Sequence, residues 1–205
     1  MKKKYVIIII AIIGVIALIG FAMGPKYYNK ALTLKEEATK QWANVESSYQ
    51  RRADLIPNIV NTAKGYAEFE QETLTKVIEA RSRATAINID PSNITPAQLE
   101  QFQQAQSGLT SVLSRLLATF ERYPELKANE NFKELINELE RTENRINVER
   151  NRYNETVRPF NLHLKTFPNN IVNKFIGQFD EMAYFKSKEG SEDAPKVDFD
   201  FGKNK

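Results

Sequence analysis

Residues 50–60 read QRRADLIPNIV and place two arginines, an aspartate and a proline inside an amphipathic pattern that is otherwise typical of a long helix. Steps of three and four residues from Tyr49 reach Arg52 and then Ile56. Arg52 therefore falls on the apolar seam, the stripe of apolar residues along one helix face, and Arg51 falls beside it. A polar residue in such a seam fixes the register of packed helices at some cost in stability. We predict that Arg52 lays its stem along the seam and pairs with an acid on a facing helix.

The remaining polar features of this stretch have structural interpretations of the same kind. Glu149 occupies a seam position much later in the chain and is a candidate partner for Arg52. Pro57 leaves one carbonyl without its amide partner and should bend the helix. Asp54, three residues earlier, is a candidate local cap. We interpret the stretch as a bend with a register-setting charge, and the alternative is a partner- or ligand-binding site at the kink.

The same spacing extends outward from this stretch, from Tyr28 to Ala84. Its apolar positions are Ala31, Ala38, Trp42, Val45, Tyr49, Ile56, Ile59, Ala63, Tyr66, Val77 and Ala84. A 3.5-residue period over many turns indicates a helix packed lengthwise against others. Such a helix would be ~90 Å long at 1.5 Å per residue. It either bends back near Pro57 or stands partly free as a stalk.

Two further long helices and one short helix follow. Thr95, Pro96 and Gln98 form a helix start in which the threonine caps free amides and the glutamine reaches back. A third helix begins after a cap region at 129–131, and Pro159 should bend it late. A short helix is predicted near 170–176. Because the connections are short, we expect an all-α, antiparallel bundle over residues 25–177.

An apolar segment precedes the bundle. Residues 1–4 form a basic flank, and residues 5–23 contain no charged side chain. A helix needs ~20 apolar residues to cross ~30 Å of hydrocarbon. We therefore predict a transmembrane anchor at 5–24, and the alternative is a cleaved signal peptide. The anchor residues are Tyr5, Val6, Ile7, Ile8, Ile9, Ile10, Ile12, Ile13, Val15, Ile16, Leu18, Ile19 and Phe21. The dense N-terminal lysines favour a cytoplasmic N-terminus, with the bundle outside the cytoplasm.

Composition argues against several functions. Lys2, Lys3 and Lys4 account for the whole excess of 29 basic over 26 acidic residues, so no surplus of positive charge indicates nucleic-acid binding. The sequence has no cysteine and one histidine, His163, and the Glu-x-x-His pairs of a di-iron bundle are absent. No Gly-rich phosphate loop or nucleophile elbow occurs. We expect no cofactor and no enzymatic activity, with an unrecognised hydrolase as a distant alternative.

Residues 178–205 end the helical pattern and are mostly polar and charged. We expect a flexible tail. Its aromatic residues are candidates to dock the tail onto the bundle or onto another chain. They are Phe179, Tyr184, Phe185, Phe199 and Phe201.

Several of these stretches, in this order, resemble the LemA family of bacterial membrane proteins. The resemblance rests on the N-terminal anchor, QRRADLIPNIV (50–60), SRLLATFERYPELKANENF (114–132), LINELERTENRINVERNRYNETVRPFN (135–161), FPNNIV (167–172) and EGSEDAPKVDF (189–199). It covers nearly the whole chain. It implies a single-pass protein of the bacterial inner membrane with a helical bundle, and it implies no catalytic residues.

Two functions follow as hypotheses. The first is a membrane-anchored, non-catalytic helical scaffold that binds other membrane or envelope proteins or organises the envelope. The second is a membrane-remodelling protein that self-associates, because long apolar seams can extend between chains as coiled coils. In both, the lipid bilayer is a partner and nucleic acid is not.

Overall fold

The computed structural model describes residues 2–65 and 70–186, apart from the side chains of residues 2, 3 and 15–20. Its helices are α1 (Lys2–Lys64), α2 (Gln71–Thr85), α3 (Pro96–Phe120), α4 (Pro124–Ala128), α5 (Glu130–Lys165) and α6 (Asn169–Val172), followed by the π-helical turn η1 (Asn173–Gly177). No strand occurs in these described ranges, so the predicted all-α class is confirmed.

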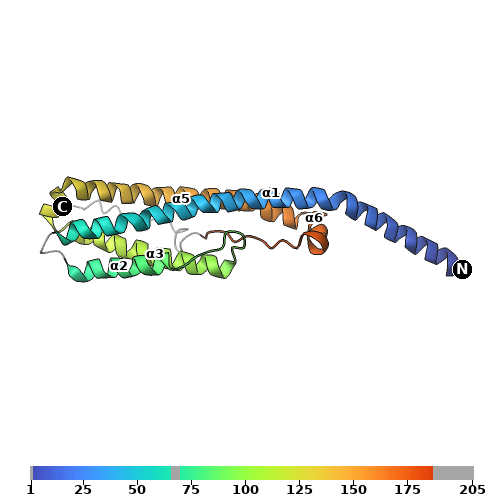
Figure 1. Cartoon of the computed structure of the whole chain (residues 1–205), viewed down its shortest axis with the longest axis horizontal. Coiled ribbons are helices and arrows are strands. Elements are labelled where there is room, and N and C mark those ends of the chain that lie inside the picture. The colour runs from blue at the N-terminus through green and yellow to red at the C-terminus, as the bar shows by residue number, and fades with distance from the viewer. Residues whose placement is uncertain (1, 66–69, 187–205) are drawn as a thin grey trace, which may run out of the picture.

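The long helices form two antiparallel pairs (Figure 1). Helices α1 and α5 run side by side over most of their length, and α2 and α3 form a shorter pair packed against them. The N-terminal part of α1 extends beyond the bundle, and α6 lies beside α1 near the start of that extension. The two pairs therefore overlap at one end of the molecule only, the end where α1 finishes and α5 begins.

The predicted first helix proves to be two helices. Helix α1 passes through Pro57 and ends at Lys64, and the chain reverses between Gly65 and α2. The chain therefore reverses after Lys64 and not at Pro57. Helix α1 is not a free stalk between Tyr27 and Ala63, because buried residues recur along that whole stretch. Glycine directly after the last helical residue is a common helix stop. The apolar spacing continues on both sides of the break, which is why the pattern suggested one helix.

The predicted helix starts of α3 and α5 are confirmed. The Thr95 side chain accepts a hydrogen bond from the Gln98 amide, and the Gln98 side chain accepts one from the Thr95 amide at 3.1 Å. Asn129 accepts a hydrogen bond from the Phe132 amide at 2.9 Å. Both caps satisfy amides that the first turn of a helix leaves free. The short helix expected near 170–176 is present as α6 and η1.

The core consists of two apolar clusters that follow one another along the bundle. The proximal cluster, nearer the start of α1, contains Tyr27, Ala31, Leu34, Ala38, Trp42, Val45, Tyr49, Ile89, Ile94, Leu99, Phe102, Ile146, Tyr153, Val157, Phe160, Leu164, Met182 and Phe185. The distal cluster contains Ile56, Ile59, Val60, Ala63, Leu74, Val77, Ala80, Ala84, Leu109, Leu113, Leu116, Phe120, Leu126, Phe132, Ile136 and Leu139. The proximal cluster is richer in aromatic rings, whereas the distal cluster is almost entirely aliphatic.

Residues 178–186, the first part of the predicted tail, dock onto the bundle, which is one of the two possibilities given for its aromatic residues. This segment, which we call the strap, follows η1 as non-helical chain and lies along the bundle (Figure 1). Met182 and Phe185 are buried in the proximal cluster, and Phe185 stacks on Trp42 with ring centroids 5.7 Å apart. Burial of these two apolar side chains offsets the entropy of ordering the segment. The rest of the predicted tail, 187–205, lies outside the described residues.

At the other end, the apolar segment is the N-terminal part of α1. The described anchor side chains are all exposed: Tyr5, Val6, Ile7, Ile8, Ile9, Ile10, Ile12, Ile13 and Phe21. The anchor residues Val15, Ile16, Leu18 and Ile19 belong to the side chains outside the described set. Among the described residues, no helix has an apolar stretch long enough to cross a membrane.

Candidate functional site

A buried arginine lies at the boundary between the two apolar clusters. Arg52 is 1% exposed, and it occupies the α1 position between Tyr49 of the proximal cluster and Ile56 of the distal cluster. Its Nη1 lies 2.6 Å from Glu143 Oε1 of α5 and donates to Thr110 Oγ1 of α3 at 2.9 Å. The predicted pairing of Arg52 with an acid on a facing helix therefore exists, but the acid is Glu143 and not Glu149.

Gln106 extends this network to a fourth helix. Its side-chain oxygen accepts from Nη2 of Arg52, and its side-chain nitrogen donates to the Ala84 carbonyl at 3.1 Å. Ala84 lies in the last turn of α2, where carbonyls have no partner within the helix. One buried arginine and one buried glutamine thus connect α1, α2, α3 and α5. Because each polar group needs its partner, this layer permits one relative alignment of the four helices.

The carbonyl that Pro57 leaves without an amide has a hydrogen-bond donor that could not be assigned from the sequence. A proline at position 57 leaves the Ala53 carbonyl without an amide, and Arg81 of α2 donates its Nε–H to that carbonyl at 2.7 Å. Helix α1 therefore continues through the proline, and the vacated carbonyl joins α1 to α2.

The other charged residues predicted in 50–60 do not contact the partners of Arg52. Arg51 is exposed and pairs with Glu138 of α5 at 2.6 Å. Asp54 accepts from Gln50 at 2.8 Å, one turn earlier on α1, and makes no helix cap in the hydrogen bonds found. Arg51, Arg52 and Asp54 therefore each contact different partners.

Glu149 serves a second polar contact between α1 and α5. It accepts from Gln41 of α1 at 2.7 Å and pairs with Arg152 at 3.1 Å on its own helix. This buried carboxylate lies among the residues of the proximal cluster, six residues along α5 from Glu143. Both acids fix α5 against α1, but at different levels of the bundle.

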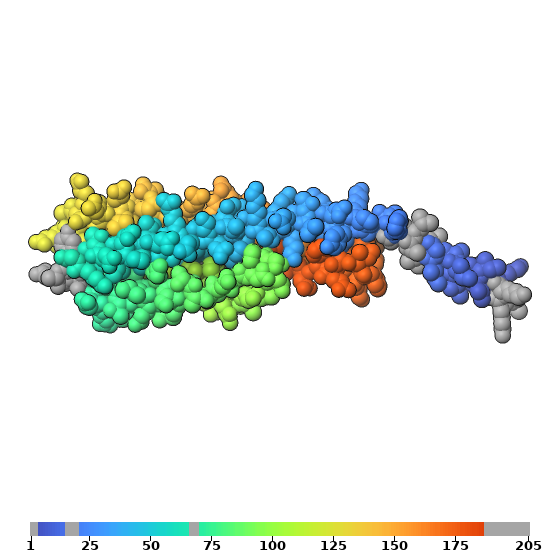
Figure 2. Space-filling model, in the orientation of Figure 1, coloured from blue at the N-terminus to red at the C-terminus, as the bar shows by residue number. Residues whose placement is uncertain are grey.

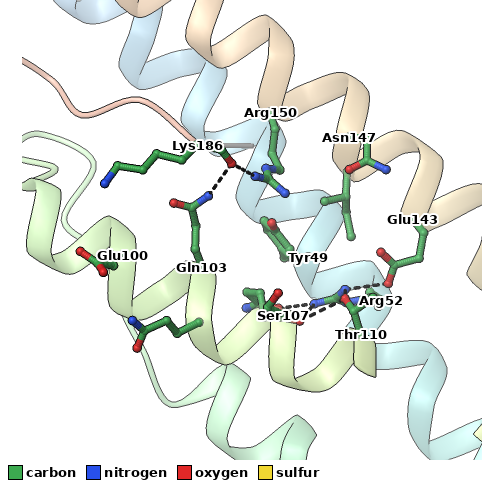
Figure 3. A pocket seen from close by; sticks show the side chains of 13 residues that line it. Tyr49, Arg52, Glu100, Gln103, Ser107, Thr110, Glu143, Asn147, Arg150 and Lys186 are labelled. Atoms are coloured by element: carbon green, nitrogen blue, oxygen red, sulfur yellow. Dashed lines mark hydrogen bonds and ion pairs between the residues drawn. The ribbon is translucent and has the colours of Figure 1, made fainter. Parts of the chain in front are cut away.

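A groove of about 730 Å³ opens beside Arg52, between α3 and α5 (Figure 3). It is lined by Tyr49, Arg52, Glu100, Gln103, Gln104, Gln106, Ser107, Thr110, Glu143, Ile146, Asn147, Arg150 and Lys186. The lining is polar and carries charges of both signs. The Arg52 guanidinium lies 5.2 Å from the centroid of the Tyr49 ring, on the wall formed by α1.

The strap enters this groove at Lys186. The Lys186 carbonyl accepts from Gln103 of α3 at 3.2 Å and from Arg150 of α5 at 3.0 Å, as the dashed lines in Figure 3 show. Arg150 also lies 4.8 Å from the centroid of the Phe185 ring. Donors from both walls thus hold the backbone of an extended chain at one end of the groove.

Three asparagines bind the strap before it reaches the groove. Asn154 donates to the Phe185 carbonyl and accepts from the Phe185 amide, both at 2.9 Å. Asn161 binds Met182 in the same way, at 2.8 and 3.0 Å. A third asparagine, in η1, binds the Phe179 backbone through the same pair of hydrogen bonds. Each side-chain amide replaces the neighbouring strand that extended backbone would otherwise need.

The spacing of these asparagines matches an extended chain. Asn154 and Asn161 are seven residues apart on a helix, about 10.5 Å at 1.5 Å per residue. Met182 and Phe185 are three residues apart, about 10 Å in extended chain. Sequence reasoning missed this match, although Asn at i and i+7 on one helix face was visible. The same heptad step from Asn154 leads back to Asn147 in the groove.

Two arginines and one buried phenol set the electrostatics of the groove wall. Burial raises the pKa of Tyr49, and the nearby charges of Arg150 and Arg52 act in the opposite direction. Arg52 Nε is buried and makes no hydrogen bond to a described residue. Across residues 2–65 and 70–186, no three His, Asp or Glu side chains lie close enough together to hold a metal ion. The amides and guanidinium groups can bind backbone carbonyls or carboxylates.

The sequence is similar to one protein family and to several named proteins over most of its length. The family model described as "LemA family" matches residues 41–199. The chain is 24% identical to magnetosome protein MamQ 2 of Paramagnetospirillum magneticum over 203 residues, which cover 90% of this chain and 73% of that protein. It is 27% identical to protein LemA of Metamycoplasma hominis over 161 residues, or 78% of this chain and 69% of the relative. The family match spans well over half of the sequence, so the chain belongs to the LemA family.

Proposed function

We propose that this protein is a single-pass, membrane-anchored and non-catalytic scaffold of the bacterial cell envelope, and that it binds extended segments of other envelope proteins. The N-terminus lies in the cytoplasm and the bundle outside it. The support for the anchor is the uncharged stretch 5–23 and the continuity of α1 from Lys2 through this stretch into the bundle. The density of lysines at positions 2–4 supports the orientation.

One observation carries the binding function: the protein already holds an extended chain against α5 and between α3 and α5. Asn154 and Asn161 contact the strap through its backbone, so their hydrogen bonds do not depend on the side chains of the bound segment. The groove continues past Lys186 with further amides at Gln104 and Asn147. A partner segment would bind there through main-chain hydrogen bonds, as extended peptides do when they are added to a sheet edge.

Site-specific photo-cross-linking in living cells tests this function. A photoreactive amino acid replaces Asn147 in the groove of the full-length chain, and a matched variant carries it at Glu79, which is exposed on α2. We expect Asn147 to cross-link to a small set of envelope proteins that Glu79 does not capture. Cross-links from Asn147 only to residues 187–205 of the same chain, or only to a second copy, would contradict binding of a different protein.

Orientation has its own test, because the sequence contains no cysteine. A full-length Ser114→Cys variant is treated in intact cells with a membrane-impermeant maleimide; Ser114 is exposed on α3. Labelling in intact cells is the expected result. Labelling only after lysis would place the bundle in the cytoplasm and contradict the proposed orientation.

A further inference from the structure

The end of the bundle nearest the predicted anchor carries an exposed apolar surface. Phe167 is 77% exposed, Ile171 49% and Phe175 74%. Ile171 and Phe175 are four residues apart and lie on one side of the short helical segment formed by α6 and η1, and Phe167 lies in the turn that leads into α6. Ile176, next to them, is 48% exposed. We call these four residues the apolar cap. Four large apolar side chains gathered within ten residues are unusual on a surface that faces only water.

The apolar cap is fixed against α1 at the level where the predicted anchor ends. An added Cβ on Gly24 would lie 3.1 Å from Ile176 Cδ1, so the two segments are in direct contact at that glycine. One turn earlier on α1, Phe21 is 85% exposed. In Figure 2 the orange-red segment that contains the cap lies beside α1, at the point where the N-terminal extension of α1 leaves the bundle. A bilayer spanned by residues 5–23 would therefore have its surface beside the cap.

The packing behind the cap holds it in this position. His163 of α5 stacks on Tyr27 of α1 with ring centroids 5.0 Å apart, and its Nε2 lies 3.2 Å from the Tyr27 carbonyl. Its Nδ1 lies 3.1 Å from the side-chain nitrogen of Asn169, the first residue of α6. The histidine thus connects α1, α5 and α6. The side chains of the cap take no part in these His163 contacts, although Ile176 packs against α1 at Gly24.

Basic residues predominate around the apolar cap, and the nearest acidic residues in the sequence are Asp180 and Glu181, of which Glu181 pairs with Lys165 at 2.7 Å. Residues 1–35 contain no Asp or Glu, and neither do residues 156–179. Lys26, Lys30 and Lys174 lie in these two segments, and all three are exposed. Apolar side chains surrounded by lysines fit the boundary between acyl chains and anionic headgroups. An acidic protein surface would match the lysines but would leave Phe167 and Phe175 less fully buried.

We infer that the apolar cap is a second membrane contact, in which Phe167, Ile171 and Phe175 insert into the headgroup region of an anionic bilayer while Lys26 and Lys174 bind its phosphates. This contact rests on the proposed membrane anchoring, and it adds a role for the bundle itself. An anchor alone holds the bundle to the membrane only through α1. A second contact fixes the long axis of the bundle relative to the membrane and so fixes where the groove is presented.

The test uses the full-length chain in vesicles of phosphatidylethanolamine and phosphatidylglycerol. Single cysteines at Phe175, Ile12 and Ser114 carry a polarity-sensitive fluorophore and report on the cap, the anchor and the distal bundle. Quenching is measured with lipids that carry a spin label at the headgroup or deep in the acyl chain. We expect headgroup-level quenching at Phe175, deep quenching at Ile12 and none at Ser114.

The outcomes separate the two proposals. Quenching at Ile12, with Phe175 as unquenched as Ser114, would overturn the cap contact and leave the anchor standing. Quenching at Phe175 without quenching at Ile12 would support the cap contact and overturn the anchor. Quenching at neither site would overturn both.

A lysine variant tests the electrostatic part of the contact. Lys174→Gln in the Phe175 reporter background should shift the ratio of bound to released cap by about five-fold, since one lysine near an anionic surface contributes about this factor. The matched control is Lys133→Gln, which is exposed at the distal end on α5. Equal quenching in vesicles with and without phosphatidylglycerol, and in both lysine variants, would overturn the role of anionic lipid.

Discussion

The distal and proximal halves of the bundle both have a closed apolar core, but different elements enclose it in each half. In the distal half four helices, α1, α2, α3 and α5, surround an aliphatic cluster. In the proximal half α2 is absent and α3 contributes only its first turns, so the strap and the chain around Ile89 and Ile94 complete the cluster. Large aromatic rings fill the wider gap that extended chain leaves, as the stack of Phe185 on Trp42 shows.

This difference shows where the molecule has a surface for another chain. A helix satisfies its own backbone groups, so the distal half needs no outside partner for them. Extended chain does not, and the proximal half supplies side-chain amides from α5 for that purpose. Binding of extended segments therefore belongs to the proximal half, and the Arg52 layer separates it from the distal half.

The largest expected effect comes from removing the boundary between the halves. Arg52→Leu leaves the Gln106 oxygen and the Glu143 carboxylate without their buried donor. We expect a loss of about 3 kcal/mol in the free energy of unfolding, at the low end for a broken buried pair because Glu143 is partly exposed. Chemical denaturation of the full chain in detergent, followed by circular dichroism, measures it.

The matched control is Arg51→Leu, because the Arg51 side chain is 61% exposed and its pair with Glu138 is a surface pair. We expect it to change the free energy of unfolding by less than about 1 kcal/mol. An Arg52→Leu loss no larger than this would refute the role of Arg52 in joining the halves. The double variant Arg52→Leu/Glu143→Gln should recover part of the loss, since it also removes the charge that Arg52→Leu leaves without its cation.

The second largest effect concerns the attachment of the strap to the proximal cluster. Asn161→Ala removes both hydrogen bonds to the Met182 backbone in a buried setting, and we expect a loss of about 2 kcal/mol. Hydrogen exchange should become faster in the strap while amides of the distal cluster keep their protection. Asn147→Ala is the control on the same helix, because Asn147 is exposed and makes none of these contacts to the strap. Equal losses in both variants would argue against binding of the strap by asparagine.

A smaller effect concerns the distal half, where Arg81 compensates for Pro57. Arg81→Ala should cost about 1.5 kcal/mol, since the Ala53 carbonyl loses a charged donor. In a Pro57→Ala background the restored amide at position 57 can reach that carbonyl, so the same substitution should cost clearly less. Unfolding of all four combinations gives the coupling free energy. Additive losses would mean that Arg81 does not serve the vacated carbonyl.

The smallest effect is a pH dependence in the distal half. Hydrogen bonds, first from Arg51 and then from Arg141, lower the pKa of Glu138. A lowered folded-state pKa stabilises the fold above the ordinary carboxyl pKa, and this contribution is lost as pH falls through the folded-state value. Glu138→Gln should therefore reduce the loss of stability between about pH 6 and about pH 3. The same acid-induced loss in both proteins would exclude this contribution.

Much of the fold could be predicted from local signals. Thr95, Asn129 and the position of Arg52 on the seam follow from residue type and spacing within single helices. The partner of Arg52 did not follow, because the offset between α1 and α5 is set by packing along both helices. A long arginine also reaches Glu143 from beside the seam.

The path of the strap along the bundle could not be predicted from the sequence, for a different reason. Its backbone is satisfied by side chains about 20 to 30 residues away in sequence, and such a segment has no periodicity of its own. Its polar residues suggested disorder. Phe179 and Phe185 were docking candidates, but neither Met182 nor the asparagine partners could be assigned from the sequence. The reversal after Lys64 was missed because the apolar spacing of α1 continues into α2 across the break.

The most direct measurement of the central claim is residue-resolved hydrogen exchange of the strap in the full-length chain. Asparagine amides accept from the backbone N–H of Phe179, Met182 and Phe185. We therefore predict slow exchange at these three amides and faster exchange at residues between them, a pattern with a period of three. Uniformly fast exchange over residues 178–186 would contradict the claim that the proximal half binds extended chain through its asparagines.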